Sequence, residues 1–377
     1  MTQRPAAGRA GTTIALRFCD GTGIWRKTAA EIAGSISGLV QSGQCLWVAS
    51  DQTASVERLT ADDADRPGAY AEHRSYRLGD FVTLPQTGDK ADTEIDLEGI
   101  DLQWLRPGTG YLWLVGSHSK ARKRVDEDDR PGKALDKLQT VTLDENRCVL
   151  LRIPVIVGAE RLPNLVPSCP DPADAARTIT AGRLTELATV IAQDEHLGPF
   201  AGLPGKDNGL DIEGLAVTGD RIYLGLRGPV LRSWACVLEI GVESAGGLTT
   251  GRALKLRRNP DPLRKHFLDL GGLGVRDLIV DGDDLVLLAG PTMVLDGPTR
   301  LLRWPGGAKA DAANLVRSGE LELIYELSYG NGNDHPEGIA TISGADGVRV
   351  VVAYDSPAPE RLLHGGDQVL ADVFPWP

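Results

Sequence analysis

The sequence predicts an all-β protein with the β-propeller fold, and three observations carry this prediction. First, a unit of two short apolar strands joined by a tight turn recurs along the chain. Second, 45 glycines and 23 prolines among 377 residues lie between the apolar runs, which is typical of turn-rich β proteins. Third, a single segment has convincing helical periodicity. Closed all-β folds of this length often form one domain.

Five segments share the order apolar strand, turn, apolar strand, polar loop. They cover residues 37–52, 98–119, 213–229, 276–292 and 337–356. Their starts are nearly evenly spaced, except for one longer step between the second and third segments. Further strand candidates follow each pair, which gives about four strands in about 40–60 residues, the pattern of a β-propeller with five visible blades. A parallel sheet of βαβ units is disfavoured, because such units need long helical crossovers.

The longer step and the two ends of the chain complete the predicted architecture. Apolar residues recur at helical spacing in residues 171–196, so we interpret residues 120–205 as an insertion with a helix near residues 171–196. A degraded sixth blade is the alternative. Residues 1–12 are predicted to be flexible, and residues 13–377 to form one domain. The last unit ends one strand short, so the strand at residues 13–18 is predicted to complete it and close the ring.

Composition and charge argue against several classes of function. The net charge of −12 disfavours a nucleic-acid binder, which would present a basic face. Five widely spaced cysteines without a C-x-x-C pair indicate neither a zinc site nor a disulfide framework. The sequence contains no nucleotide, heme or nicotinamide fingerprint. No stretch approaches the length of a membrane span and no apolar leader is visible, so the cytoplasm is the expected compartment.

Charged residues occupy equivalent positions in the repeated units. The first strands start at Ser37, Glu98, Glu213, Arg276 and Glu337, and the second strands end at Asp51, His118, Arg227, Gly290 and Asp355. In a propeller, both positions lie at the same mouth of the central channel. Carboxylates in a narrow site repel one another, which raises their pKa values unless a cation or an arginine neutralises them. We therefore predict a site for Ca²⁺, or for Mg²⁺ or Mn²⁺, with five candidate ligands: Glu98, Glu213, Glu337, Asp51 and Asp355.

A structural role is the alternative for these side chains. Acidic residues at strand starts can accept backbone N–H bonds from the next blade. Arg227 and Arg276 can act as counter-ions, which would leave an ion-pair network without a metal. The glycines that follow the three glutamates fit close packing near the channel under either interpretation.

The segments DIEGLAVTGDRIYLGLRGPVL, residues 211–231, and HPEGIA, residues 335–340, resemble the DUF3616 family. This family is a bacterial group without an assigned activity, and the resemblance extends from about Gly38 to the C-terminus. More distantly, the D-x-E-G strand starts are similar to those of phytase-like and gluconolactonase-like propellers. That similarity implies a metal-dependent hydrolase of phosphate esters or lactones, with Glu98, Glu213 and Glu337 as ligands. Those families add an Asn and an Asp where this chain has His118, Arg227 and Gly290.

Two classes of function follow from these observations. In the first, the three glutamates hold a metal that activates water, and the chain hydrolyses a small anionic ester or lactone. Arg227 and Arg276 would then bind the substrate's phosphate or carboxylate, and His118 would act as a general base. In the second, the propeller is not catalytic. It would bind a protein partner through residues 120–196, or sense a small molecule in the same channel without turnover.

Overall fold

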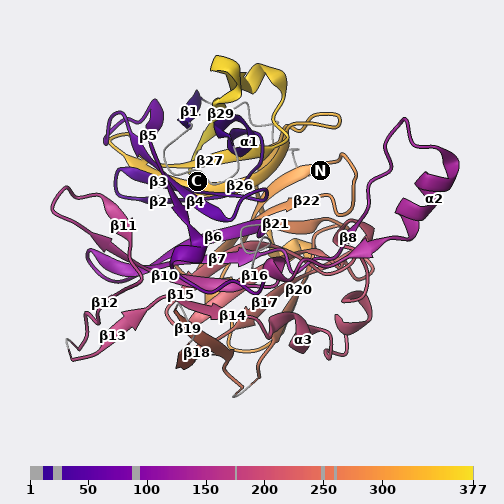
Figure 1. Ribbon diagram of the computed structural model, residues 1–377, viewed down its shortest axis with the longest axis horizontal. Coiled ribbons are helices and arrows are strands. Elements are labelled where there is room, and N and C mark those ends of the chain that lie inside the picture. Colours follow the sequence, from indigo (N-terminus) through magenta and orange to yellow (C-terminus); the bar gives the residue numbers. More distant parts are fainter. Residues whose placement is uncertain are drawn as a thin grey trace.

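The computed structural model describes residues 12–19, 28–86, 94–174, 176–247, 251–258 and 261–376. The described part is mostly β-structure (Figure 1). Nearly all of the predicted flexible segment 1–12 lies outside the described residues. None of the helices within the described ranges is long and apolar enough to cross a membrane.

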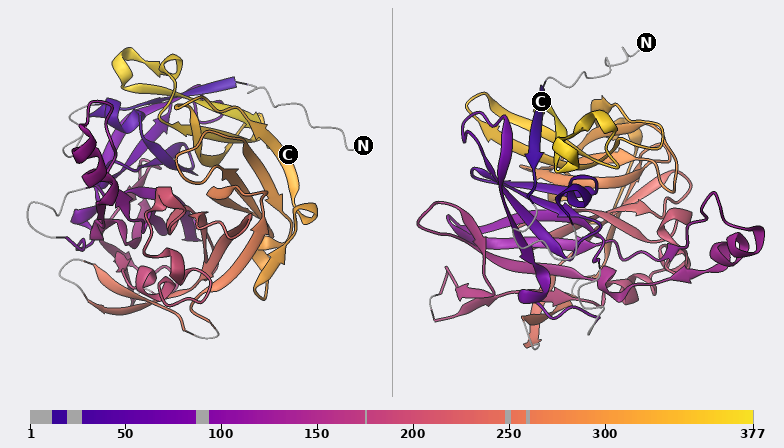
Figure 2. Two further views of the ribbon diagram at one scale, coloured as in Figure 1. Left: turned by 90° about the vertical axis from the view of Figure 1, so that its right-hand side faces the viewer. Right: turned by 45° about the horizontal axis from the view of Figure 1, so that its top comes forward.

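The strands form five antiparallel hairpins whose first strands surround a common centre (Figure 2). The first strands are β2 (Ile36–Ser42), β6 (Leu97–Arg106), β15 (Asp211–Thr218), β21 (Gly274–Asp281) and β26 (His335–Gly344). Their partners are β3 (Cys45–Ser50), β7 (Thr109–Gly116), β16 (Arg221–Gly228), β22 (Asp284–Gly290) and β27 (Gly347–Asp355). Each first strand contacts the next one along the chain, and β26 contacts β2. The contacts therefore form a closed, propeller-like ring.

Two further strands extend each hairpin outward. They are β4 (Ser55–Ala61) and β5 (Ala69–Arg77); β10 (Leu150–Val157) and β14 (Gly182–Leu184); β17 (Trp234–Ile240) and β20 (Arg264–Asp269); β23 (Thr299–Trp304) and β25 (Glu322–Leu327); and β29 (Gln368–Pro375) and β1 (Thr12–Arg17). The strand β1 pairs antiparallel with β29 and parallel with β5. The N-terminal strand thus completes the last group, as the sequence predicts.

The remaining elements decorate this ring. Additional strands are β8 (Ala121–Arg122), β9 (Val141–Thr142), β11 (Pro163–Leu165), β12 (Ser168–Pro170), β13 (Thr178–Thr180), β18 (Val242–Gly247), β19 (Arg252–Leu256), β24 (Asn314–Val316) and β28 (Leu362–Leu363). The α-helices are α1 (Ala29–Ala33), α2 (Pro131–Gln139) and α3 (Leu187–Ile191). Short 3-10 turns are η1 (Leu78–Asp80), η3 (Glu145–Arg147), η4 (Gly198–Phe200), η5 (Gly205–Asp207), η6 (Gly307–Lys309), η7 (Ser318–Glu320), η8 (Pro359–Arg361) and η9 (His364–Gly366).

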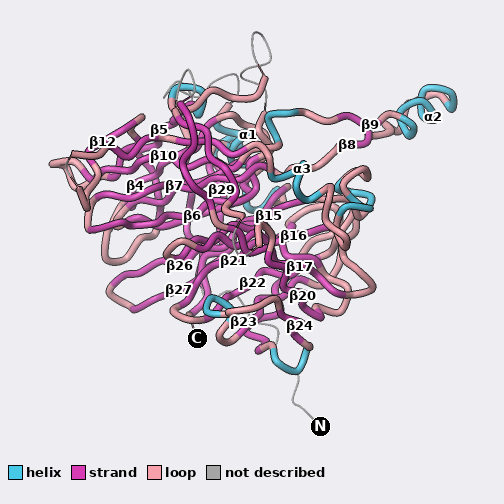
Figure 3. Tube along the Cα trace, turned by 90° about the horizontal axis from the view of Figure 1, so that it is seen from below, coloured by secondary structure: helices cyan, strands magenta, loops and turns pink. Residues whose placement is uncertain are grey.

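The predicted helix near residues 171–196 is wrong for most of its length. Among the described residues of this range α3 is the only α-helix, and β13 and β14 occupy residues 178–180 and 182–184. Thr178, Ile179 and Thr180 are β-branched and favour a strand. Gly182 allows β14 to approach β19, because a Cβ there would lie 2.9 Å from Cδ2 of Leu254. The longest helix of the insertion is instead α2, on an arm between β8 and β9 that projects from the body (Figures 1 and 3).

Apolar cores lie between neighbouring groups of strands rather than at the centre of the ring. Each adjacent pair of groups shares a buried cluster that draws side chains from both of them. Examples from successive interfaces are Trp47 with Leu112, Leu150 with Leu224, Tyr223 with Leu287, Leu288 with Val352, and Val351 with Leu39. Because the apolar residues are buried at these interfaces, polar side chains occupy the ends of the first strands that face the centre of the ring.

Candidate functional site

All five first strands carry a β-bulge at the repeated position. The register against the partner strand shifts between Ile36 and Gly38, Leu97 and Gly99, Ile212 and Gly214, Val275 and Asp277, and Pro336 and Gly338. The residues inside these shifts are Ser37, Glu98, Glu213, Arg276 and Glu337. A bulge leaves one residue without a cross-strand partner and redirects its side chain. The positions aligned in the sequence are therefore equivalent in the structure.

Glycine after the bulge lets neighbouring first strands approach closely. A Cβ on Gly99 would lie 2.6 Å from Cβ of Leu215, and a Cβ on Gly214 would lie 2.8 Å from Cδ2 of Leu278. Real Cβ atoms do not tolerate such distances. The close approach brings the bulge residues of different strands together at the centre.

Glu98, Glu213 and Glu337 form a buried carboxylate cluster. Each contributes one oxygen, and these three oxygens lie within 4.8 Å of one another. Arg227, at the end of β16, places Nη1 2.8 Å from Oε1 of Glu213. Arg276, in the bulge of β21, places Nε 2.9 Å from Oε2 of Glu213 and donates from Nη2 to Oε1 of Glu337 at 2.6 Å. The sequence-predicted glutamates and arginines thus converge.

The negative charge of the cluster exceeds its positive charge. Arg227 also donates to Asp211, so Asp211, Glu213 and Glu337 share two guanidinium groups, and Glu98 is a fourth carboxyl group beside them. Glu98 is the carboxylate that no guanidinium contacts within the described residues. Its Oε2 is buried and lacks a hydrogen-bond partner there. A buried carboxylate in this state is costly unless it gains a proton or a cation.

The pKa directions reflect this imbalance. Burial raises the pKa of Glu98 well above its usual value, and the negative charges of Asp96, Glu213 and Glu337 raise it further. Burial also raises the pKa of Glu337, although Arg276 opposes the shift. The pKa of Asp211 is raised to about 7 by burial, against the effect of Arg227. In the absence of a cation, Asp211 therefore takes up a proton near neutral pH, and burial favours the protonated form of Glu98 and Glu337 as well.

Asp51 and Asp355 flank the cluster without joining it. Both lie beside Ser35, because the backbone N–H of Asp51 donates to the Ser35 carbonyl and Asp355 forms a β-bridge with Ser35. Neither belongs to the group of oxygens within 4.8 Å. Burial raises the pKa of Asp51 to about 8, and the charges of Asp355 and Asp96 add to the shift. These two predicted ligands are close enough for their charges to raise the pKa values of the cluster, Asp51 that of Glu98 and Asp355 that of Glu337.

His118 is a buried neutral imidazole. Its Nδ1 lies 2.8 Å from the carbonyl oxygen of Gly116, which places the proton on Nδ1 and leaves Nε2 as an acceptor. Nε2 is buried and has no hydrogen-bond partner among the described residues. Burial lowers the pKa of His118 to about 4, and the hydrogen bond to Gly116 opposes this. In the described part of the chain, no ion pair or hydrogen bond joins His118 to the three glutamates.

The sequence missed two groups around the site. Arg147 contacts Glu94 and places Nη1 3.0 Å from Oδ2 of Asp96. Asp101 and Asp277 accept backbone N–H bonds from the neighbouring first strands, at 2.6 Å from Val217 and 2.8 Å from Ile339. These aspartates thus perform one of the two structural roles that the sequence allowed for acidic residues, the acceptance of backbone N–H bonds from the next strand. Asp101 and Asp277 follow the bulge closely, but nothing in the sequence separates their role from that of the glutamates.

Comparisons with known proteins identify a family and distant structural similarities. A protein-family model described as "Protein of unknown function (DUF3616)" matches residues 35–372. A search of curated proteins finds no match. The allergen Mala s 1 of Malassezia sympodialis is 8% identical, with 90% of this chain and 93% of that chain covered and a TM-score of 0.42. The PQQ-bound aldose sugar dehydrogenase of Streptomyces coelicolor is 16% identical, with 98% and 99% covered and a TM-score of 0.36. Scores this low carry no information on activity.

Proposed function

This chain belongs to the DUF3616 family, and because that family has no known function, we propose one from the site itself. We propose that the chain is a five-bladed β-propeller that binds a divalent cation at one mouth of its central channel. There it hydrolyses a small anionic ester or lactone. The single observation that carries the proposal is Glu98, a buried carboxylate without a guanidinium partner, beside Glu213 and Glu337.

The spacing of the carboxylates supports a shared cation. Ca²⁺ binds carboxylate oxygens at about 2.3–2.6 Å, so two oxygens on one ion are at most about 5 Å apart. The three glutamate oxygens meet this limit, since they lie within 4.8 Å of one another. Mg²⁺ and Mn²⁺ also take oxygen ligands and are the alternatives to test. The donor set therefore fits a hard divalent cation.

The charge of the cluster supports the same ion. Four carboxylates and two guanidinium groups leave two negative charges, which one divalent cation would neutralise. Glu98, Glu213 and Glu337 would hold the ion. Arg227 and Arg276, which contact carboxylates, would keep Glu213 and Glu337 in position rather than bind substrate. A bound cation would polarise the substrate oxygen and lower the pKa of a coordinated water.

His118 is the proposed general base. It is neutral at pH 7 because burial lowers its pKa to about 4, and its Nε2 has no partner within the described ranges. The vacant acceptor nitrogen of a neutral imidazole can accept a proton, and at a pKa of about 4 it is a weak base, so it would act on a water that the cation has already made more acidic. The proposed substrate is small, because the channel mouth is bordered by five first strands that contact their neighbours.

A thermal melt tests the cation site. The protein is melted in EDTA and then with Ca²⁺, Mg²⁺ or Mn²⁺ in excess. A cation that binds the folded state at about 100 times its Kd adds about 2.7 kcal/mol of stability. We expect Glu98→Gln to lose this gain and to fold normally, because no guanidinium depends on Glu98. The matched control is Glu322→Gln, an exposed residue of β25 outside the channel.

Turnover is measured separately on panels of phosphate esters and lactones. We expect hydrolysis that requires the cation, is lost in Glu98→Gln, and is reduced in His118→Asn without loss of cation binding. A cation-dependent rise in Tm without hydrolysis of either panel would favour the sensor alternative. The absence of any cation effect on wild-type protein would contradict the proposal.

A protein-interaction scaffold is the second candidate, and the arm formed by β8, α2 and β9 favours it. Helix α2 has no buried residue, and Leu135 and Leu138 are 60% and 49% exposed. Exposed leucines on a projecting helix are typical of contact surfaces. The sequence predicts a contact surface within residues 120–196. Residues 182–184 pair with β10 in a sheet of the body, so we assign the contact surface to the arm alone. The partner proposed for this surface is a second copy of the chain. We therefore expect wild-type protein to self-associate in sedimentation, and the double variant Leu135→Glu, Leu138→Glu to be monomeric. Equal sedimentation would contradict this candidate.

A further inference from the structure

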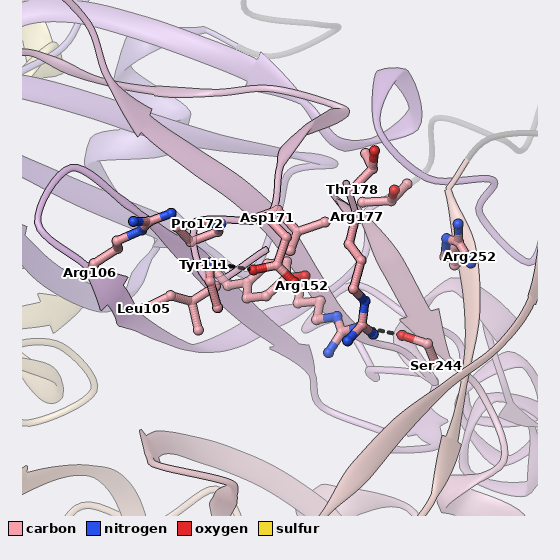
Figure 4. Close-up of a pocket in the computed structure, with 13 residues that line it drawn as sticks. Leu105, Arg106, Tyr111, Arg152, Asp171, Pro172, Arg177, Thr178, Ser244 and Arg252 are labelled. Carbon is pink, nitrogen blue, oxygen red and sulfur yellow. Dashed lines mark hydrogen bonds between the residues drawn. The ribbon is translucent and has the colours of Figure 1, made fainter. Parts of the chain in front are cut away.

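A pocket of about 920 Å³ is lined by residues of β6, β7, β10, β13, β18 and β19 and of the loop before β13 (Figure 4). Arg106 ends β6 and lines the pocket, whereas Glu98 lies near the start of the same strand. Eight residues of strand separate them, which corresponds to roughly 26 Å. The pocket is therefore independent of the carboxylate cluster and of the function proposed for it.

Among the described residues, arginines are four of the five charged residues that line this pocket. They come from β6, β10, the loop before β13, and β19: Arg106, Arg152, Arg177 and Arg252. Asp171 is the acidic residue of the lining, and its Oδ1 accepts the backbone N–H of Ala173 at 2.8 Å. Within the described part of the chain, none of the four arginines has an ion-pair partner. Such a concentration of positive charge is unexpected on a chain with a net charge of −12.

Arg152 lines the pocket and is held in place by two aromatic rings and Ser244. Its guanidinium carbon lies 4.7 Å from the ring centre of Tyr111 and 5.7 Å from that of Trp113. Its Nη2 donates to Oγ of Ser244 at 2.6 Å, whereas its Nε is buried without a hydrogen-bond partner among the described residues. Burial lowers the pKa of Arg152, and the charge of Arg252 contributes to the same direction. The aromatic rings and Ser244 thus fix a cationic group that no carboxylate of the described residues contacts in an ion pair.

We propose that this pocket binds a small polyanion with two or more phosphate or carboxylate groups. The planar guanidinium groups match both kinds of anion in bidentate geometry. The hydroxyls of Ser244, Thr178 and Thr180 line the same pocket and add hydrogen-bond donors. The volume falls within the range of small-molecule sites. Convergence of arginines on one concave surface, rather than along a stripe, favours a small ligand over a nucleic acid.

Isothermal titration calorimetry tests the pocket with two probes, sodium pyrophosphate and sodium citrate. The protein is freed of metal on a chelating resin and titrated in metal-free buffer without EDTA, which is itself a polycarboxylate, at constant ionic strength, so that cation chelation and bulk screening do not contribute. We expect wild-type protein to bind at least one probe. The double variant Arg177→Gln, Arg252→Gln should raise its Kd at least tenfold, and both residues are exposed, so the fold should persist. Arg152→Gln should weaken binding in the same direction.

The control is Arg66→Gln, which removes one positive charge, as Arg152→Gln does, from an exposed arginine that pairs with Asp346 elsewhere on the surface. Its Kd should stay within twofold of wild type. Tighter binding of pyrophosphate identifies phosphate as the preferred group, and tighter binding of citrate identifies carboxylate. The proposal is overturned if wild-type protein binds neither probe at millimolar concentration. It is also overturned if Arg66→Gln weakens binding as much as the pocket variants.

Discussion

Glu98 and Glu213 show how the same residue type at the same bulge can have opposite energetic roles. Glu213 contacts two guanidinium groups, those of Arg227 and Arg276. Glu98 contacts none within the described ranges. Both residues have buried oxygens without a hydrogen bond of good geometry, so the guanidinium contacts are what separates them. Removing a partner from a buried ion pair is costly, whereas removing an uncompensated buried charge is not. The two residues are therefore separable by experiment.

Glu213→Gln should lower the free energy of unfolding by about 3–5 kcal/mol, because both arginines lose a carboxylate partner. Glu98→Gln should leave it unchanged or raise it when no cation is present. Urea denaturation in EDTA measures both. Equal losses in the two variants would show that Glu98 belongs to the structural network after all.

Asp51 should make stability depend on pH. Burial raises its folded-state pKa to about 8, above the unfolded value near 3.9. Folding therefore favours the protonated form, and the stabilisation is present at acidic pH and is lost as pH rises through about 8. Between pH 6.5 and 9 in EDTA, the unfolding free energy of wild-type protein should fall. The unfolding free energy of Asp51→Asn should fall less steeply over the same pH range. An unchanged slope would show that Asp51 does not cause the pH dependence.

The bulged first strands are the elements that build the site. The sequence contains the repeated Glu-Gly pair, and from its period the equivalence of the five positions could be predicted. The bulge itself could not, because one additional residue in a strand leaves no mark on the period. The helix assigned near residues 171–196 failed for a related reason. The helix was predicted from the spacing of apolar residues alone. That spacing takes no account of the β-branched residues at Thr178–Thr180 or of the pairing of β14 with β10.

Gly99→Ala and Gly214→Ala test the close approach of these strands. The added methyl would meet Leu215 or Leu278 at less than 3 Å, so each variant should lose about 1–3 kcal/mol of stability. Gly132→Ala in α2 is the matched control, since nothing lies within 4 Å of its Cβ. Chemical denaturation compares the three variants. Stability losses no larger than that of the control would argue against tight packing at the bulge.

Closure of the ring depends on a strand from the opposite end of the chain. The sequence could predict this strand because the last unit is one strand short. Its contacts could not be read from the sequence, nor could the arginine-lined pocket, whose residues come from strands and loops far apart in the chain. Proximity of the ion-pair partners likewise depends on how the first strands are placed around the centre. The repeated sequence pattern predicts where a residue lies along its strand. Which charged side chains pair depends on the distances between strands, and the pattern does not contain these.

A substitution at Leu16 tests how much the closure of the ring contributes to the stability of the fold. Leu16 is fully buried in β1, within the core shared by the first and last groups of strands. Leu16→Ala should reduce the free energy of unfolding by about 2–5 kcal/mol. Thr12→Ala, at the exposed start of the same strand, should change it little. If Leu16→Ala matched Thr12→Ala in denaturation, β1 would contribute little to ring closure.

Anomalous X-ray scattering from crystals of the full chain grown with Mn²⁺ locates a bound cation directly. The cation proposal predicts an anomalous peak among the carboxylates of Glu98, Glu213 and Glu337, within about 2.0–2.6 Å of their oxygens. It predicts no peak at this position in Glu98→Gln crystals grown in the same way. An empty position in wild-type crystals, with Arg227 and Arg276 still on their carboxylates, would contradict the cation site and identify the cluster as a structural ion-pair network.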